Sequence, residues 1–359
     1  MINLKSNTLK GYYGETPDDY SLKFIHYDFF IEEENPVEWQ NLENDLKNIF
    51  DYTHDFQIYF QNISHFLKII NTTHILQNYY ANIFLRINNL EEYYQFKKAK
   101  ITFPIHLIVS KNDLLKFDIT SENITLQIDK ISELTEKDLE ELRQKYKITQ
   151  ILLGQINYLS RENKYLYDVM AKMYHMDSHN YEELEKMNKI TNDVYDSDTY
   201  IKIVQKIKEI IKSLCIKNEM DAIHKVYEYI AQTVSYTSLL PNQTNIENQN
   251  LIGPLFKQES VCEGYAKLFY QTMSLLNINT TIVVGGGKKE EGGHIWNQVF
   301  INDTWYNLDV TAHSYNLKHN IQNNTFLVAD DCLYYKAYTL LAHKCATSFS
   351  EDNNSKKLS

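Results

Sequence analysis

The most constraining feature of this sequence is a hairpin in its C-terminal third. Two runs with strand-like alternation, Gly293–Ile301 and Thr304–Thr311, are separated only by Asn302-Asp303. A two-residue turn joins antiparallel strands in a defined register, which here pairs Ile301 directly with Thr304. The sequence therefore predicts both a sheet and the residues that face each other across it.

Side chains that can take part in catalysis lie on one face of this predicted hairpin. Because side chains alternate along a strand, His294, Trp296 and Asp309 share one face. Gln298 and its opposite number Asn307 lie on the same face. In this register His294 and Asp309 are diagonal neighbours about 7 Å apart at the backbone, a gap that an imidazole and a carboxylate can bridge. A three-residue loop would instead place the two residues on opposite faces.

Cys262 stands near the predicted start of a helix. Ser260 followed three residues later by Glu263 is the capping-box pattern, which makes Cys262 the second residue of the helix. Apolar residues continue downstream at helical spacing as a buried face: Ala266, Phe269, Tyr270, Met273 and Leu276. The unpaired N–H groups and the positive dipole end at a helix start favour a thiolate and can receive an oxyanion. An isolated cysteine is more often inert and buried, but the predicted His294–Asp309 pair favours a nucleophile whose proton His294 takes.

Three blocks of the sequence, taken in combination and in order, resemble the core motifs of the transglutaminase-like superfamily. They are Cys262–Ala266, Gly293–Val299 and Trp305–Thr311. The upstream segments Asn250–Gly253 and Val234–Tyr236 are similar to the bacterial branch of that superfamily. The N-terminal half of the chain has no counterpart in this resemblance.

The resemblance implies a papain-like α+β fold, in which a helix that bears the nucleophile packs on an antiparallel sheet that bears the His and the Asp. Carried over to this chain, Cys262 is the nucleophile, His294 the general base and Asp309 the orienting carboxylate. The similarity spans roughly residues 199–331. One departure is visible: the family usually continues the third motif with Trp and Asp, whereas Ala312-His313 stands here, beside the implied substrate wall.

Three further residues are candidates for the oxyanion site or the cleft. Gln258, four residues before Cys262, either donates a hydrogen bond to the oxyanion or is simply exposed. Tyr265 and Trp296 either line the cleft or belong to the core. Gly264, inside the predicted helix, destabilises it by about 1 kcal/mol relative to alanine, which points to close packing beside the nucleophile.

The implied chemistry is acyl transfer through a thioester on Cys262. The thioester passes either to water, as in a cysteine protease or deamidase, or to an amine, as in a crosslinking transglutaminase. We expect hydrolysis rather than transfer to an amine, and we expect the substrate to be a protein or a peptide. The alternatives are crosslinking, and a binding or scaffold domain that keeps the fold without turnover.

We expect neither a metal ion nor a cofactor. Cys332, His343 and Cys345 cluster in the sequence, but they lack zinc-type pair spacing and a fourth ligand, so packing roles are favoured. The segment Gly285–Lys289 lacks the first spaced glycine and the Ser or Thr of a phosphate loop. It is more typical of a flexible turn, which could border the cleft just before His294.

The chain divides into three predicted segments. Residues 1–158 form a mixed α/β module of unknown role, residues 159–347 a helical region followed by the catalytic domain, and residues 348–359 a polar tail. In the first segment the apolar pattern predicts helices at 36–52 and 135–146 and strands at 55–63, 80–87, 101–109, 124–131 and 148–155. In the second, apolar stripes at helical spacing predict packed helices over 200–211 and 223–230.

Charge and composition limit the partners. The 359 residues include 36 Lys and Arg against 47 Asp and Glu, a net charge of −11, which argues against binding nucleic acid or an anionic membrane. The sequence shows neither a secretion signal nor an apolar stretch of membrane-spanning length. We therefore expect a cytoplasmic protein, with secretion by a signal-independent route still open. Four cysteines do not make a disulfide scaffold, and the oligomeric state is not predicted.

Overall fold

The structure is a computed structural model, and it describes most of the chain in separate stretches. These are residues 27–31, 56–60, 63–64, 66–67, 82–120, 122–153, 193–237, 246–286, 293–330, 332 and 345–349. The predicted helix at 36–52 lies outside the described residues, as do His343 and the part of the glycine-rich turn from Gly287 to Lys289.

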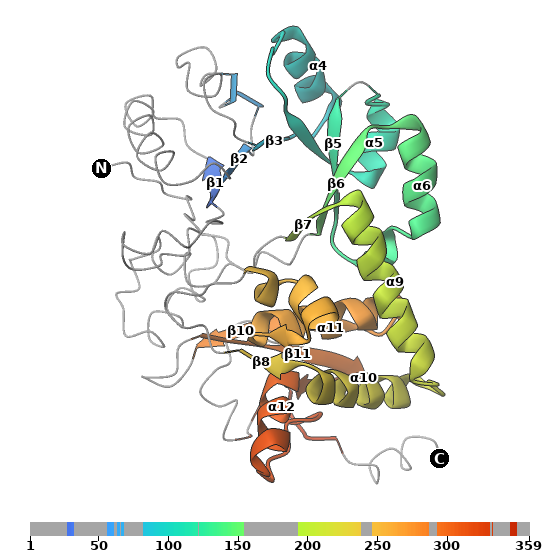
Figure 1. The fold of residues 1–359 in the computed structure, drawn as a ribbon, viewed down its shortest axis with the longest axis vertical. Coiled ribbons are helices and arrows are strands. Elements are labelled where there is room, and N and C mark those ends of the chain that lie inside the picture. Colours follow the sequence, from blue (N-terminus) through green and yellow to red (C-terminus); the bar gives the residue numbers. More distant parts are fainter. Residues whose placement is uncertain are drawn as a thin grey trace, which may run out of the picture.

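A seven-stranded sheet dominates the first part of the described chain (Figure 1). Its strands lie in chain order: β1 (Tyr27–Ile31), β2 (Phe56–Phe60), β3 (Asn82–Arg86), β4 (His106–Ser110), β5 (Asn123–Ile128), β6 (Ile148–Leu153) and β7 (Asp193–Asp196). Neighbours are parallel from β1 to β6, and β7 runs antiparallel to β6. The five strands that alternation predicts are present as β2 to β6, whereas β1 and the parallel order are not predicted.

Helices connect the parallel strands and cover one face of the sheet. Parallel neighbours need a crossover, and α4 (Leu90–Lys98), α5 (Lys111–Phe117) and α6 (Glu136–Lys145) follow β3, β4 and β5 in turn. Leu114 of α5 and Leu139 of α6 are buried in one apolar cluster with strand residues such as Leu107. A capping box of Thr135 and Asp138 starts α6 and confirms the helix predicted at 135–146.

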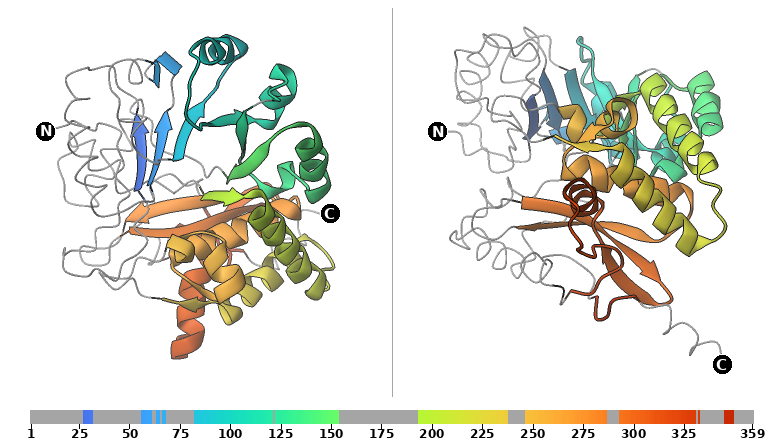
Figure 2. Two further views of the ribbon diagram at one scale, coloured as in Figure 1. Left: turned by 45° about the horizontal axis from the view of Figure 1, so that its top comes forward. Right: turned by 60° about the horizontal axis from the view of Figure 1, so that its bottom comes forward.

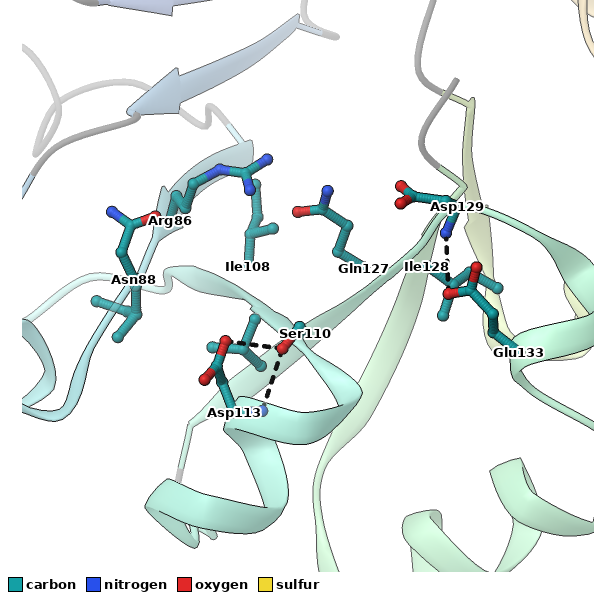
Figure 3. Close-up of a pocket in the computed structure, with 11 residues that line it drawn as sticks. Arg86, Asn88, Ile108, Ser110, Asp113, Gln127, Ile128, Asp129 and Glu133 are labelled. Carbon is teal, nitrogen blue, oxygen red and sulfur yellow. Dashed lines mark hydrogen bonds between the residues drawn. The ribbon is translucent and has the colours of Figure 1, made fainter. Parts of the chain in front are cut away.

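A polar cavity of about 240 Å³ lies at the carboxyl ends of β3, β4 and β5 (Figure 3). Arg86 and Gln127 project into it, and Asp129 and Glu133 line its far side. The cavity contains none of the predicted site residues.

Two long helices begin the second part of the chain. They are α9 (Ser197–Ser213), which packs against β6 and β7, and α10 (Glu219–Thr233). Their buried residues include Tyr200, Ile203 and Ile207 in α9 and Ile223 and Ile230 in α10. The two predicted apolar stripes are therefore confirmed as packing faces.

The C-terminal part packs helices on a three-stranded antiparallel sheet (Figure 2). The sheet has the order β10 (Thr280–Gly286), β11 (Gly293–Ile301), β12 (Thr304–Leu308). The helix α11 (Cys262–Leu275) packs against β10 and β11, and α12 (Val310–His319) packs against α10 and α11. This is the α+β, papain-like arrangement that the resemblance implies.

Short elements complete the surroundings of α11. A two-stranded parallel ladder joins β8 (Ser235–Tyr236) to β9 (Glu259–Ser260), which lies just before α11. Single turns of helix occur at η1 (Ile131–Glu133), η2 (Ile246–Gln249) and η3 (Gly253–Lys257).

A strand links the two parts of the chain, and the C-terminal end packs on the second part. β7 belongs to the first sheet although it lies beyond residue 159, and it leads directly into α9. At the other end, the amide of Phe349 donates to the carbonyl of Leu327 at 2.9 Å, so the start of the predicted polar tail is docked on the core. None of the helices in the described part of the chain combines the length and the apolar character needed to cross a bilayer.

Candidate active site

Cys262 is the first residue of α11, and its side chain is half-buried. Val261, not Ser260, is the N-cap residue, and it makes no side-chain capping bond. Ser260 donates instead to the carbonyl of Asn248 at 2.8 Å, while Glu263 pairs with Lys267. The predicted capping box is therefore wrong, because the Ser260 hydroxyl and the Glu263 carboxylate are taken by Asn248 and Lys267. Cys262 nevertheless lies in the first turn, as expected.

Gly264 leaves room for the chain that crosses the start of α11. A Cβ atom at this position would lie 2.7 Å from the carbonyl oxygen of Asn248 and closer still to Oγ of Ser260. The carbonyl is part of the backbone and cannot swing away. The prediction of close packing beside the nucleophile is confirmed.

The hairpin has the predicted register. Ile301 pairs with Thr304, and Gln298 pairs with Asn307. The two turn residues, Asn302-Asp303, have φ values of 49° and 61°, the left-handed conformation that a two-residue hairpin of this kind requires. The second strand is shorter than predicted, since β12 ends at Leu308 and the chain then enters α12.

Asp309 is the N-cap residue of α12 and the partner of His294. Its Oδ1 accepts the backbone N–H of Ala312 at 2.9 Å, and its Oδ2 lies 2.7 Å from Nε2 of His294. Its side chain is fully buried, whereas 15% of the His294 side chain is exposed. A carboxylate held at one oxygen by a helix end presents the other oxygen to the imidazole in a fixed direction.

His294 also contacts Cys262. Burial lowers the pKa of His294, but the charge and hydrogen bond of Asp309, followed by the hydrogen bond and charge of Cys262, raise it to about 10. Because Nε2 faces Asp309, Nδ1 is the ring nitrogen left for the thiol. The structure thus brings Cys262, His294 and Asp309 together in one chain of contacts.

The other three predicted site residues do not share one environment. Tyr265 is fully buried, and its hydroxyl donates to the carbonyl of Val234 at 2.6 Å. Trp296 is also buried; it stacks on His294 with ring centroids 5.9 Å apart and donates to Oδ1 of Asn307 at 3.1 Å. Both belong to the core rather than to an exposed cleft wall. Gln258 is exposed and adopts a left-handed backbone with φ of 57°.

Tyr236 is a neighbour of Cys262 that the residue-by-residue reading of the sequence does not select. Partial burial and the charge of Cys262 both raise the pKa of Tyr236. It pairs with Ser260 across the β8–β9 ladder, which brings it beside the start of α11, and it remains 46% exposed. The only signal in the sequence is its place in the Val234–Tyr236 segment.

His313 occupies the position at which the sequence departs from the family pattern. Its Nε2 lies 2.9 Å from Oε1 of Glu228, and its ring stacks on Tyr227 at a centroid distance of 4.4 Å. The side chain thereby joins α12 to α10, and these interactions involve none of Cys262, His294 and Asp309.

The remaining cysteines differ in their surroundings. Cys215 is exposed and Cys332 is half-buried, whereas Cys345 is buried and accepts a hydrogen bond from Nε2 of Gln298 at 3.1 Å. Burial first, and then the nearby Asp330, raise the pKa of Cys345. Within the described residues, no three His, Cys, Asp or Glu side chains are grouped so that they could hold a metal ion.

Comparison with known proteins identifies one segment. Residues 208–310 match the family model of the transglutaminase-like superfamily, and no curated protein matches the chain. A structure described as a candidate cysteine protease from Cytophaga hutchinsonii is 20% identical, with a TM-score of 0.27, over 30% of this chain and 37% of that protein. A structure described as a TGase is 15% identical, with a TM-score of 0.31, over 58% of this chain and 64% of that one. This chain spans less than two thirds of the length of either protein. At these identities and TM-scores, neither protein supports an inference about the reaction.

Proposed function

Since residues 208–310 match the family model of the transglutaminase-like superfamily, we propose that this protein is a thiol enzyme that cleaves carboxamide or peptide bonds. The observation that carries the proposal is His294, which lies between Asp309 at 2.7 Å and the thiol of Cys262. In this role Cys262 is the nucleophile, His294 the general base and acid, and Asp309 the orienting carboxylate.

The proposed reaction begins from the ion pair that the raised pKa of His294 favours. The Cys262 thiolate attacks the substrate carbonyl carbon, and the carbonyl oxygen becomes an oxyanion beside the first amides of α11. The His294 imidazolium then gives its proton to the leaving amine or ammonia, and a thioester remains on Cys262. Attack by water, with His294 now accepting the proton, breaks the C–S bond, releases the acid and regenerates the thiolate–imidazolium pair.

Two side chains are candidates to assist the oxyanion. The charge of Cys262 is, after partial burial, the second cause that raises the pKa of Tyr236, so the Tyr236 hydroxyl lies within electrostatic reach of Cys262. Gln258 is exposed in the segment that leads into α11. A single donor to an oxyanion contributes about 10²- to 10³-fold to a rate, so either contribution is measurable.

Hydrolysis is the proposed outcome, and transfer to an amine is the alternative from the same thioester. The two outcomes are separated by incubating a glutamine-containing peptide with the protein, with and without a primary amine. Hydrolysis predicts release of ammonia or a cleaved peptide in both cases, whereas crosslinking predicts a peptide that has gained the amine.

The first test of the proposal is the reactivity of Cys262. We expect iodoacetamide to label Cys262 faster than Cys215, although Cys215 is exposed and Cys262 only half-buried. The His294→Ala variant should lose this preference. Equal labelling in the native protein, or activity retained by Cys262→Ala, would count against a thiol enzyme.

A further inference from the structure

The helix that carries Cys262 is buried on all sides, polar residues included. Every residue of α11 from Glu263 to Ser274 is buried. Three of its polar residues are spaced four apart and therefore lie along one face: Glu263, Lys267 and Gln271. Buried polar groups are unfavourable unless they find partners, so this face needs a specific counterpart.

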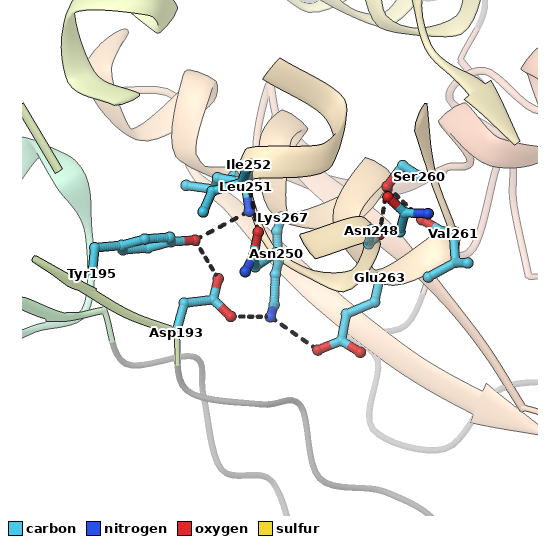
Figure 4. Close-up of polar contacts among 10 residues, drawn as sticks. All are labelled: Asp193, Tyr195, Asn248, Asn250, Leu251, Ile252, Ser260, Val261, Glu263 and Lys267. Carbon is cyan, nitrogen blue, oxygen red and sulfur yellow. Dashed lines mark hydrogen bonds and ion pairs between the residues drawn. The ribbon is translucent and has the colours of Figure 1, made fainter. Parts of the chain in front are cut away.

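The counterpart is the seven-stranded sheet and the turn that follows β5. The Lys267 side chain has no exposed surface; its Nζ lies 2.7 Å from Oδ1 of Asp193 on β7 and 2.9 Å from Oε1 of Glu263 (Figure 4). One turn further along, Oε1 of Gln271 accepts the backbone N–H of Ile131 at 2.9 Å.

Tyr195 extends the same contact to the segment that precedes α11. Its hydroxyl donates to Oδ2 of Asp193 at 2.9 Å and accepts the backbone N–H of Leu251 at 3.1 Å (Figure 4). These two residues of β7 are buried: Asp193 is 5% exposed and Tyr195 is 3% exposed. One edge of the sheet thus holds both the first turns of α11 and the chain that approaches it.

We infer that Asp193 and Lys267 form a positioning pair, through which the N-terminal sheet holds the first turn of α11 and Cys262 in register with His294. The inference rests on the proposed thiol chemistry and extends it to a part of the chain without an assigned role. Asp193 and Tyr195 lie outside residues 208–310, so the family match does not include this contact.

The pair also anchors the residue next to Cys262 in the chain. Glu263 directly follows Cys262, and its Oε1 lies 2.9 Å from Nζ of Lys267. Lys267 draws the Glu263 carboxylate into an ion pair that is anchored on the sheet by Asp193. Without this anchor the first turn of α11 can shift, and Cys262 with it, relative to the His294 imidazolium that stabilises a thiolate. Two titratable groups interact electrostatically with Cys262: His294 on β11 and Tyr236 on β8.

The test is the pH dependence of Cys262 alkylation, measured site by site by mass spectrometry in the full-length protein. Lys267→Met removes the cation and keeps an apolar side chain of similar length. We expect Cys262 to react at least about ten-fold more slowly at neutral pH, with the midpoint of its pH profile raised by about one unit. Asp193→Glu keeps the charge and should retain most of the wild-type rate.

Two comparisons separate positioning from stability. Lys206→Met breaks an exposed ion pair with Glu209 on α9 and should leave the alkylation profile unchanged. If Lys267→Met does not fold, Asp193→Leu combined with Lys267→Met replaces both charges of the pair by apolar groups and should show the same raised midpoint.

The outcomes distinguish this inference from the proposed function. A Lys267→Met protein that is less stable but keeps the wild-type alkylation rate and midpoint would reduce the pair to a purely structural contact and overturn the inference. Wild-type Cys262 that reacts no faster than Cys215 would instead overturn the proposed function itself. A raised midpoint in the variants, with fast wild-type labelling, supports both.

Discussion

The carboxylate of Asp309 serves His294 and the first turn of α12 at the same time. One oxygen lies 2.7 Å from Nε2 of His294, and the other accepts the amide of Ala312 at 2.9 Å. A side chain held at both oxygens cannot rotate without breaking one of these bonds. The orientation of the imidazole toward Cys262 is therefore set by the point at which a strand becomes a helix.

Asp309→Asn should leave the fold intact and slow the reaction by about 10³- to 10⁴-fold. The asparagine oxygen can still cap α12, but its amide group offers a donor to the imidazole and favours the wrong tautomer. Single-turnover kinetics and circular dichroism on the same preparation check both parts. An unchanged rate would mean that another residue orients His294.

Stability should fall as the pH rises from 6.5 toward 10. The pKa of His294 is raised in the folded protein from 6.5 to about 10, so the native state holds this proton more tightly than the unfolded chain. The resulting stabilisation is complete below pH 6.5 and is lost as the pH rises through the folded value. Urea unfolding of the wild type and of His294→Gln measures it, because other groups titrate in both proteins and cancel in the difference. A difference that stays constant across this interval would contradict the prediction.

Gly264→Ala should destabilise the protein by about 1–3 kcal/mol, the range typical of overpacking. The new methyl group would meet the Asn248 carbonyl at 2.7 Å, and the higher helix propensity of alanine offsets only about 1 kcal/mol. Glu209→Ala, at an exposed position of α9, is the control and should change the free energy of unfolding by less than about 0.5 kcal/mol. Equal stability of the two variants would show that the Asn248 segment can move.

Tyr236→Phe should lower kcat by about 10²- to 10³-fold with little change in KM, because it removes a hydroxyl near the proposed oxyanion and keeps the ring. Gln258→Ala, measured in parallel, reports on the other candidate donor. Wild-type kinetics for Tyr236→Phe would exclude its hydroxyl from the reaction.

Local patterns in the sequence predict the hairpin and most of the strands. The register depends on two turn residues and on side-chain alternation, both of which act over a few residues, and the pairing of Gln298 with Asn307 confirms it. The contact between His294 and Asp309 follows from that register. Five of the strands in the first sheet are likewise predicted from alternation alone.

Distant contacts are what the sequence does not predict. The capping box is wrong because the Ser260 hydroxyl donates to the carbonyl of Asn248, 12 residues earlier in the chain. Lys267 gives no local sign of full burial, since its partner Asp193 is 74 residues away. The core position of Tyr265 likewise depends on a distant contact, the hydrogen bond of its hydroxyl to the carbonyl of Val234, 31 residues earlier.

The position of β7 has a practical consequence for dissecting this protein. A fragment that begins at residue 208, where the family match starts, would lack Asp193 and Tyr195. Lys267 would then lose its ion pair with Asp193, and the amide of Leu251 would lose the Tyr195 hydroxyl that accepts it. An inactive or insoluble fragment of this kind would therefore say nothing about the chemistry of Cys262, and the shortest informative piece must include the strand at residues 193–196.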